Sequence, residues 1–169
     1  MTLRLNIGAG GKRIPGFTGV DAVERPGADV VALANKLPFD DGAAEELMAI
    51  HLVEHIVPWD VQGTLDEWFR VLKSGGKLVL EMPDIIKCCQ NIIDGVMRGG
   101  KHPDQLGYWG AYGDPRFEDP WMLHRWGWCF KTLKPLVEKS GFIKIKEFQT
   151  QFHPAGRNCR DFRLEAIKP

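Results

Sequence analysis

Strand-like segments alternate with helix-like segments along this chain of 169 residues, and this alternation constrains the fold more than any other feature. Apolar runs predict strands at residues 3–7, 17–22, 28–33, 47–50, 77–82, 142–148 and 159–167. Helical spacing predicts helices that end at the glycines of positions 75–76, 99–100 and 141. The pattern favours an α/β fold with an open, mostly parallel sheet. The last two strands are expected to pair as a C-terminal antiparallel hairpin, with a turn at residues 154–156.

The segment at about 101–128 lacks clear periodicity and is aromatic-rich. It holds four of the six tryptophans and both tyrosines. This composition argues against disorder, and long loops inside compact domains are usually functional. We therefore expect one domain over residues 1–169, with this segment as an aromatic insert.

Charge and hydropathy exclude several classes of protein. The 22 basic and 22 acidic side chains balance, whereas nucleic-acid binders usually show a basic excess. No apolar stretch approaches the roughly 20 residues of a membrane span, and the first residues lack a signal-peptide pattern. We expect a cytoplasmic protein that binds neither nucleic acid nor membrane. The cysteines at 88, 89, 129 and 159 are interpreted as small core residues in the reduced state.

A glycine turn, Gly8-Ala9-Gly10-Gly11, follows the first predicted strand and allows a ligand to approach the backbone closely. A dinucleotide fingerprint would need a glycine at Arg13 and room for a long helix, and only 12 residues separate Gly8 from Asp21. S-adenosylmethionine carries no phosphate and needs only a glycine turn and an acid after the second strand. Gly8, Gly10 and Asp21 provide these groups, although a tight strand exit explains the glycines equally well.

Five segments, taken in order, resemble the signatures of one family. They are Leu5-Asn6-Ile7-Gly8-Ala9-Gly10, Val20-Asp21, Leu37-Pro38-Phe39, His51-Leu52-Val53-Glu54-His55 and Phe69-Arg70-Val71-Leu72-Lys73-Ser74-Gly75-Gly76-Lys77-Leu78. The family is the class I, Rossmann-like S-adenosylmethionine-dependent methyltransferases, of the small single-domain type. The resemblance implies a three-layer Rossmann-like sandwich and release of S-adenosylhomocysteine as product.

The same resemblance assigns residues to the cofactor. It implies cofactor contacts from Gly8, Ala9 and Gly10, ribose contacts from Asp21, adenine contacts from Asn35, Lys36 and Leu37, and a cofactor-facing position for His51. Two positions depart from the family pattern. Asn6 stands where an acid is usual, and Asn35 or its neighbours replace the aspartate that often recognises adenine.

His51, Glu54 and His55 also spell the H-x-x-E-H pattern of a zinc peptidase. Two histidines four residues apart share a zinc ion only if they lie on one helix face. His51 directly follows a predicted strand, so we expect no metal here and place His51 beside the transferable methyl group. Glu54 and His55 either begin the next turn or cap the following helix, and capping is favoured for Glu54.

Acceptor-side candidates lie at strand ends and in the aromatic insert. His124 is the preferred general base, with an ordinary packed histidine as the plain alternative. Asp84 and Glu81 flank Pro83 at the end of the fifth strand, where Glu81 is expected to be either exposed at the rim or functional. Three tryptophans are pocket-wall candidates and three arginines are candidates to bind an anion: Trp109, Trp121, Trp126, Arg116, Arg125 and Arg157.

We therefore expect a methyltransferase that acts on an oxygen or nitrogen atom of a small molecule, with His51, His124 and Asp84 as catalytic candidates. An anionic acceptor and a homodimer are left open. One alternative is a non-catalytic module that only binds S-adenosylmethionine. A further alternative is a zinc hydrolase that uses the H-x-x-E-H cluster.

Overall fold

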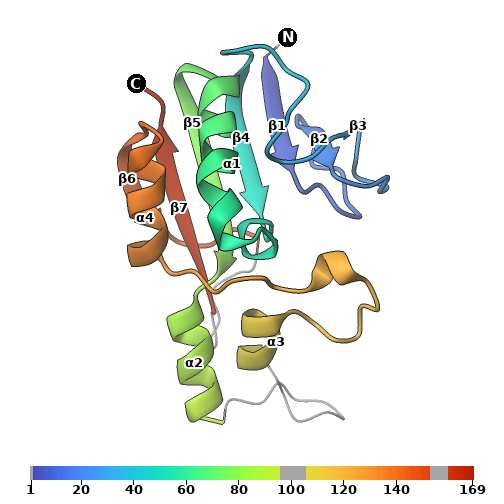
Figure 1. The fold of residues 1–169 in the computed structure, drawn as a ribbon, viewed down its shortest axis with the longest axis vertical. Helices are drawn as coiled ribbons and strands as arrows, with labels where there is room; N and C mark the ends of the chain where they lie inside the picture. Colours follow the sequence, from blue (N-terminus) through green and yellow to red (C-terminus); the bar gives the residue numbers. More distant parts are fainter. Residues whose placement is uncertain (1, 96–105, 153–159) are drawn as a thin grey trace.

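The computed structural model describes residues 2–95, 106–152 and 160–169, which form one seven-stranded sheet (Figure 1). Its strands are β1 (Leu3–Ile7), β2 (Thr18–Asp21), β3 (Val30–Val31), β4 (Ala44–Ile50), β5 (Leu72–Pro83), β6 (Ile143–Phe148) and β7 (Asp161–Ile167). Their order in the sheet is β3-β2-β1-β4-β5-β7-β6.

The sheet is parallel from β3 to β5, and β7 is antiparallel to both of its neighbours. The predicted Rossmann-like sheet with a C-terminal antiparallel hairpin is thus confirmed. The chain moves outward from β1 through β2 to β3 and then returns to the other side of β1 with β4. Open α/β sheets bind ligands at the carboxyl ends of the strands, where the order reverses in this way. The β1–β4 boundary is that position.

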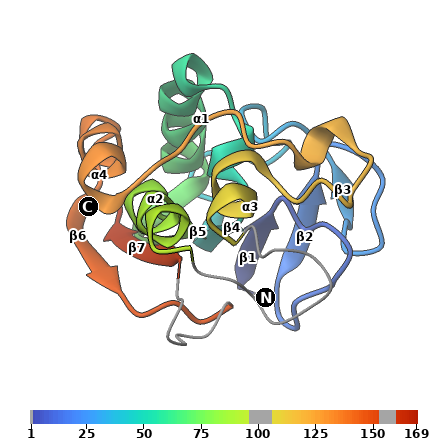
Figure 2. The ribbon, with the colours of Figure 1, turned by 90° about the horizontal axis from the view of Figure 1, so that it is seen from below.

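Four helices accompany the sheet: α1 (Pro58–Val71), α2 (Ile85–Ile93), α3 (Leu106–Tyr112) and α4 (Phe130–Lys139). Helices α1 and α4 lie against one face of the sheet, whereas α2 and α3 lie beyond its carboxyl edge (Figures 1 and 2). Two helices therefore extend past the edge where a ligand is expected. Within the described part of the chain, no helix is long and apolar enough to cross a membrane.

Helix α1 anchors the core because its apolar residues recur at helical spacing and are buried against the sheet. Val61, Leu65 and Trp68 are fully or almost fully buried. Pro58 occupies the first turn, where its missing N–H costs no hydrogen bond. The indole nitrogen of Trp68 donates to the carbonyl of Ala34 at 2.9 Å, so the bulkiest core side chain also fixes the segment after β3.

Two expected features differ in the structure. Gly75 and Gly76 do not cap α1, because the helix ends at Val71 and β5 begins at the next residue. Gly75 keeps the expected left-handed backbone, with φ 76°, but within the first part of β5. Of the cysteines, Cys88 and Cys129 are buried as expected, whereas Cys89 is exposed. Cys159 and the predicted turn at 154–156 lie outside the described residues.

The aromatic insert is not a loop throughout, because it contains α3 and a 3-10 turn at Pro120–Met122. Glycines obscured the helical period of α3. A Cβ atom at Gly107 would lie 2.5 Å from the carbonyl oxygen of Cys88, and one at Gly110 would overlap the Cys88 thiol. These glycines let α3 approach α2 closely. Because α3 is stabilised by this close backbone contact with α2, its sequence shows no apolar stripe at helical spacing.

Candidate functional site

A pocket of about 940 Å³ opens at the carboxyl edge of the sheet. One side is lined by residues that follow β1, β2, β3 and β4, including Gly8, Asp21, Asn35 and His51. The other side is lined by the segment 109–125. The sheet edge and the aromatic insert thus face each other across one continuous space.

The glycine turn after β1 forms the sheet-side end of this pocket. Gly8 and Gly10 have φ values of 72° and 59°, a left-handed conformation that glycine adopts without steric cost. A carboxylate oxygen of Asp21 accepts the N–H of Gly10 at 2.9 Å, and the other accepts that of Val23 at 3.2 Å. The carboxylate that follows β2 therefore also holds the glycine turn in place.

These groups fit S-adenosylmethionine. A Cβ atom at Gly10 would have no neighbour closer than 4.0 Å, so the turn presents backbone to open space. Asp21 lines the same space with a carboxylate, the group that accepts hydrogen bonds from a ribose diol. Gly8, Gly10 and Asp21 are therefore the residues that would hold the methionine and ribose parts of the cofactor.

The residues predicted to contact adenine separate in the structure. Asn35 lines the pocket, whereas Lys36 and Leu37 do not. Leu37 is buried in the core, and its N–H donates to the carboxylate of Glu67 at 2.7 Å. Ala9 is buried beside the turn, with its N–H bonded to the carbonyl of Val20 at 3.0 Å. Of the three residues predicted to contact adenine, only Asn35 lines the pocket.

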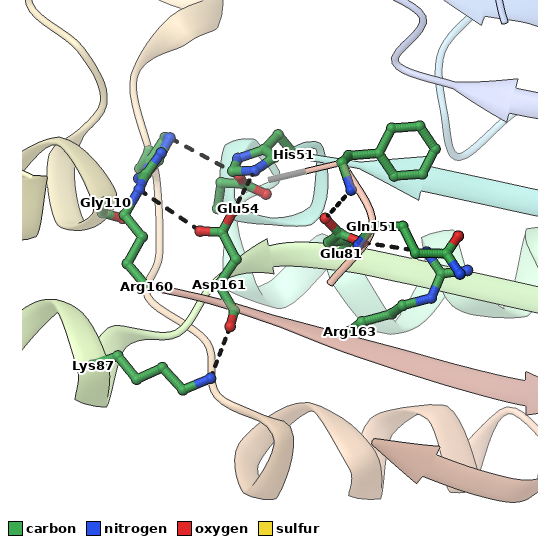
Figure 3. Close-up of polar contacts among 11 residues, drawn as sticks. His51, Glu54, Glu81, Lys87, Gly110, Gln151, Arg160, Asp161 and Arg163 are labelled. Atoms are coloured by element: carbon green, nitrogen blue, oxygen red, sulfur yellow. Dashed lines mark hydrogen bonds and ion pairs between the residues drawn. The ribbon is translucent and has the colours of Figure 1, made fainter. Parts of the chain in front are cut away.

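His51, at the end of β4, is held on both ring nitrogens (Figure 3). Nδ1 lies 3.0 Å from Oε1 of Glu54, and Nε2 lies 3.0 Å from Oδ2 of Asp161. The backbone is left-handed, with φ 52°, and the N–H donates to the carbonyl of Glu81 at 2.7 Å. Such a conformation in a residue with a side chain is costly and concentrates at functional sites.

Burial and charge determine the protonation states around His51. Burial by itself would lower the pKa of His51, but the carboxylates of Asp161 and Glu54 outweigh it and raise the pKa to about 10. Burial would likewise raise the pKa of Glu54, but the hydrogen bond from His51 prevails and lowers it. His51 is thus an imidazolium between two carboxylates at neutral pH. It cannot act as a general base.

Glu54, His55 and His124 lie together next to His51. One ring nitrogen of each histidine and a carboxylate oxygen of Glu54 all fall within 4.8 Å of one another. The backbone oxygen of Glu54 accepts from the N–H groups of Arg125 and Trp126, which ties the aromatic insert to the end of β4. Burial lowers the pKa of His124 and keeps its ring neutral at pH 7.

Two acidic candidates have structural partners. Asp84 is the N-cap of α2, where it accepts the N–H of Ile86 at 3.0 Å, and it does not line the pocket. The structure therefore gives no support to the catalytic role predicted for Asp84. Glu81 is fully buried and accepts from Arg163 and from the backbone of Gln151 (Figure 3). Of the two alternatives expected for Glu81, exposure at the rim is wrong, and a functional role stays a prediction.

The arginines in the pocket differ in how they are paired. Arg116 is bound by Asp114, and Arg25 by Asp119. Arg160 was not singled out from the sequence, yet it lines the pocket, and its buried Nη1 has no hydrogen-bond partner among the described residues. Arg125 also lines the pocket, whereas Arg157 lies outside the described residues.

Of the three tryptophan candidates, Trp109 and Trp121 line the pocket, and Trp126 is half exposed outside it. Asp161 is the main site residue that sequence reasoning missed. A signal was available, because Asp161-Phe162-Arg163-Leu164-Glu165 alternates charged and apolar residues in a predicted strand. That alternation indicates a charged sheet face, but the partner of each charge depends on strand register.

The zinc-peptidase arrangement predicted as an alternative does not form. Both ring nitrogens of His51 are engaged by carboxylates, and His51 does not share a helix face with His55. Nothing in the comparisons below points to a hydrolase.

Comparisons with known proteins agree with this geometry. A family model described as a methyltransferase domain matches residues 18–80. Among proteins with curated descriptions, none matches the sequence. A possible histamine N-methyltransferase from Thermotoga maritima has 18% identity and a TM-score of 0.65, over 100% of this chain and 83% of that chain. An S-adenosylmethionine-dependent methyltransferase from Archaeoglobus fulgidus has 17% identity and a TM-score of 0.62, over 99% and 86%.

A third solved structure, from Haemonchus contortus, is larger. It is phosphoethanolamine N-methyltransferase 2 in complex with S-adenosylmethionine, with 15% identity and a TM-score of 0.60, over 100% of this chain and 50% of that chain. The same enzyme is also known in complex with phosphomonomethylethanolamine and S-adenosylhomocysteine. At these identities the structural likeness shows the fold, and the family match indicates a methyltransferase domain over residues 18–80. The chain has the fold of the class I, Rossmann-like S-adenosylmethionine-dependent methyltransferases.

Proposed function

We propose that this methyltransferase modifies an oxygen or nitrogen atom of a small molecule bound between the sheet edge and the segment 109–125. The observation that carries the proposal is the continuity of the pocket, which reaches from Gly8 and Asp21 to Trp109 and Arg125. Its volume of about 940 Å³ lies near the upper end of the range of about 300–1,000 Å³ usual for ligand pockets. It has room for the cofactor and a small acceptor together.

Within this pocket, Gly8, Gly10 and Asp21 would hold the cofactor, whose sulfonium supplies the methyl group. The cofactor would supply a methyl group to an acceptor lone pair, and the electron pair of the broken sulfur–carbon bond would stay on sulfur, which would leave S-adenosylhomocysteine. Such an in-line displacement depends mainly on alignment of the acceptor. The imidazolium of His51 would serve to fix the end of β4 at this position.

An acceptor that carries a proton must lose it. His124 is the residue suited to act on that proton or on the acceptor atom, because its neutral ring lines the pocket. Nδ1 of His124 lies 2.9 Å from the carbonyl oxygen of Gly110, so Nδ1 donates and the lone pair is on Nε2.

We further propose that the acceptor carries an anionic group. Arg160 has a buried guanidinium nitrogen without a hydrogen-bond partner in the described part of the chain, and Arg125 lines the same space. Guanidinium groups match carboxylates and phosphates in geometry and charge. The Haemonchus contortus enzyme of the same fold is known in complex with a phosphorylated amine, an acceptor of this class.

The test is a screen of small hydroxy and amino compounds in matched pairs, in which one member carries a carboxylate or phosphate and the other does not. The screen measures formation of S-adenosylhomocysteine. We expect turnover with a member of the anionic set, and we expect Arg160→Gln to raise KM for that compound more than for its neutral partner. His124→Gln should lower kcat by about 100-fold or more while cofactor affinity is retained. Transfer to protein or RNA only, with no small molecule accepted, would overturn the proposal.

A further inference from the structure

Glu54, His55 and His124 form a cluster of three potential metal ligands next to His51, at the carboxyl end of β4. One ligand atom from each residue lies within 4.8 Å of the other two. The side chains of Glu54 and His124 are 2% and 7% exposed. Because the backbone of Glu54 accepts from the N–H of Arg125 at 2.6 Å, the two segments that carry these ligands are bound to each other.

Each histidine is oriented by a backbone carbonyl. Nδ1 of His55 lies 3.1 Å from the oxygen of Leu123, and Nδ1 of His124 lies 2.9 Å from the oxygen of Gly110. A carbonyl oxygen only accepts, so both Nδ1 atoms donate, and Nε2 is the atom of each ring that is left to bind a metal ion. Histidines that bind metal are usually held in this way, with the second ring nitrogen donating to a carbonyl or carboxylate.

Glu54 supplies the independent observation. Its Oε1 is engaged by His51, but its buried Oε2 has no hydrogen-bond partner within residues 2–95, 106–152 and 160–169. A buried carboxylate oxygen without a partner is costly. Nε2 of His124 lies 4.0 Å from Oε1 of Glu54, too far for a hydrogen bond. The separation instead fits two atoms that bind the same metal ion. With metal–ligand distances of 2.0–2.2 Å, two such atoms lie about 3–4 Å apart.

We propose that Glu54, His55 and His124 bind one divalent first-row transition-metal ion, Zn²⁺ by preference, with its remaining coordination positions open toward the pocket. Two imidazoles and one carboxylate are a ligand set of open zinc and non-haem iron sites. The ion would neutralise the orphaned oxygen of Glu54. Its role rests on the proposed function, because an open position would hold the oxygen or nitrogen atom of the acceptor in line with the methyl group.

This site differs from the H-x-x-E-H arrangement. The sequence pattern would use His51, whose two nitrogens are already engaged by Glu54 and Asp161. His124, which is 69 positions beyond His55 in the chain, replaces it.

The experiment measures metal content and affinity of the full-length protein. The protein is analysed as isolated, then stripped with a chelator and titrated with Zn²⁺ and with Co²⁺, whose visible absorption reports coordination. We expect one equivalent per chain. Glu54→Gln and His124→Gln should each weaken binding by more than about 100-fold, beyond the usual effect of losing a residue that only supports a ligand. Asp41→Asn removes an exposed carboxylate that does not line the pocket and should leave metal affinity unchanged.

Because Glu54 is buried, its variant could fail to fold. His55→Gln is the second variant, and circular dichroism and S-adenosylmethionine affinity verify that each protein is folded. If folded wild-type protein binds no ion stoichiometrically, or if Glu54→Gln and His124→Gln retain wild-type metal affinity, the site is refuted. Methyl transfer that persists in chelated protein would refute the role of the ion and leave the proposed function intact. Metal binding without transfer to any small molecule would refute the proposed function and leave the metal site intact.

Discussion

Replacement of Asp161 by asparagine should destabilise the protein strongly, because it removes one carboxylate from a buried pair. Oδ2 of Asp161 lies 3.0 Å from Nε2 of His51, and the two side chains are 1% and 19% exposed. Removal of one partner from a buried ion pair typically costs about 3–5 kcal/mol, since a charge remains without compensation. Glu54 still neutralises His51 in part, so we expect a loss near the lower end, about 3 kcal/mol.

For a chain of this length, each kcal/mol lowers the melting temperature by about 2–4 °C, so Asp161→Asn should melt roughly 6–12 °C below wild type. Urea unfolding at pH 6.5 gives the free energy of unfolding directly. Asp41→Asn is the matched control, because the 82% exposed Asp41 is paired with Arg70 at the surface and should contribute less than about 1 kcal/mol.

The same pair predicts how stability depends on pH. The folded-state pKa of His51 is about 10, above its ordinary value of 6.5, with Asp161 and Glu54 as the cause. The stabilisation is therefore fully present below about pH 6.5 and is lost as pH rises through 10. The gap in unfolding free energy between wild type and Asp161→Asn should narrow over this range. Arg160 also faces this pair, with Nε 3.7 Å from Oδ1 of Asp161. A gap below about 1 kcal/mol at pH 6.5 would refute the reasoning.

Three further outcomes are expected. Asp21→Asn should weaken S-adenosylmethionine binding at least about tenfold in calorimetry, because hydrogen bonds to a charged acceptor contribute about 1.5–3 kcal/mol each; unchanged affinity would contradict the assigned ribose site. In chemical unfolding, Gly19→Ala should destabilise the chain, because its Cβ would overlap the carbonyl oxygen of Gly27, whereas Gly63→Ala, with no atom within 4 Å, should stabilise α1 by about 0.5–1 kcal/mol. In mass spectrometry after alkylation at pH 8, Cys89 should react and Cys88 should not, since burial raises the pKa of the Cys88 thiol to about 12.

Local sequence patterns predicted the parts of the fold in which periodicity and burial coincide. The strand at Leu3–Ile7 and the apolar stripe from Val61 to Trp68 are examples, because one face of each element is buried in one core. Helix α3 could not be predicted in this way. Its contact with α2 depends on the absence of side chains at Gly107 and Gly110, so no apolar period marks it.

The candidate site also has one part that could be predicted from the sequence and one part that could not. The position of Gly8, Gly10 and Asp21 at the pocket could be predicted, because they lie at or just beyond the ends of β1 and β2, and the ends of parallel strands meet at one edge. The partners of His51 could not. Asp161 is 110 positions away in the chain, and only the register of β7 against β5, which places Asp161 opposite Pro83, brings its carboxylate to His51.

The most direct test of the account is a crystal structure of the protein with S-adenosylhomocysteine. We predict that the ribose hydroxyls bind Asp21, that the amino-acid part lies along Gly8 and Gly10, and that the sulfur faces the space between His51 and His124. Binding of S-adenosylhomocysteine away from Asp21, or with its sulfur turned away from His124, would contradict it.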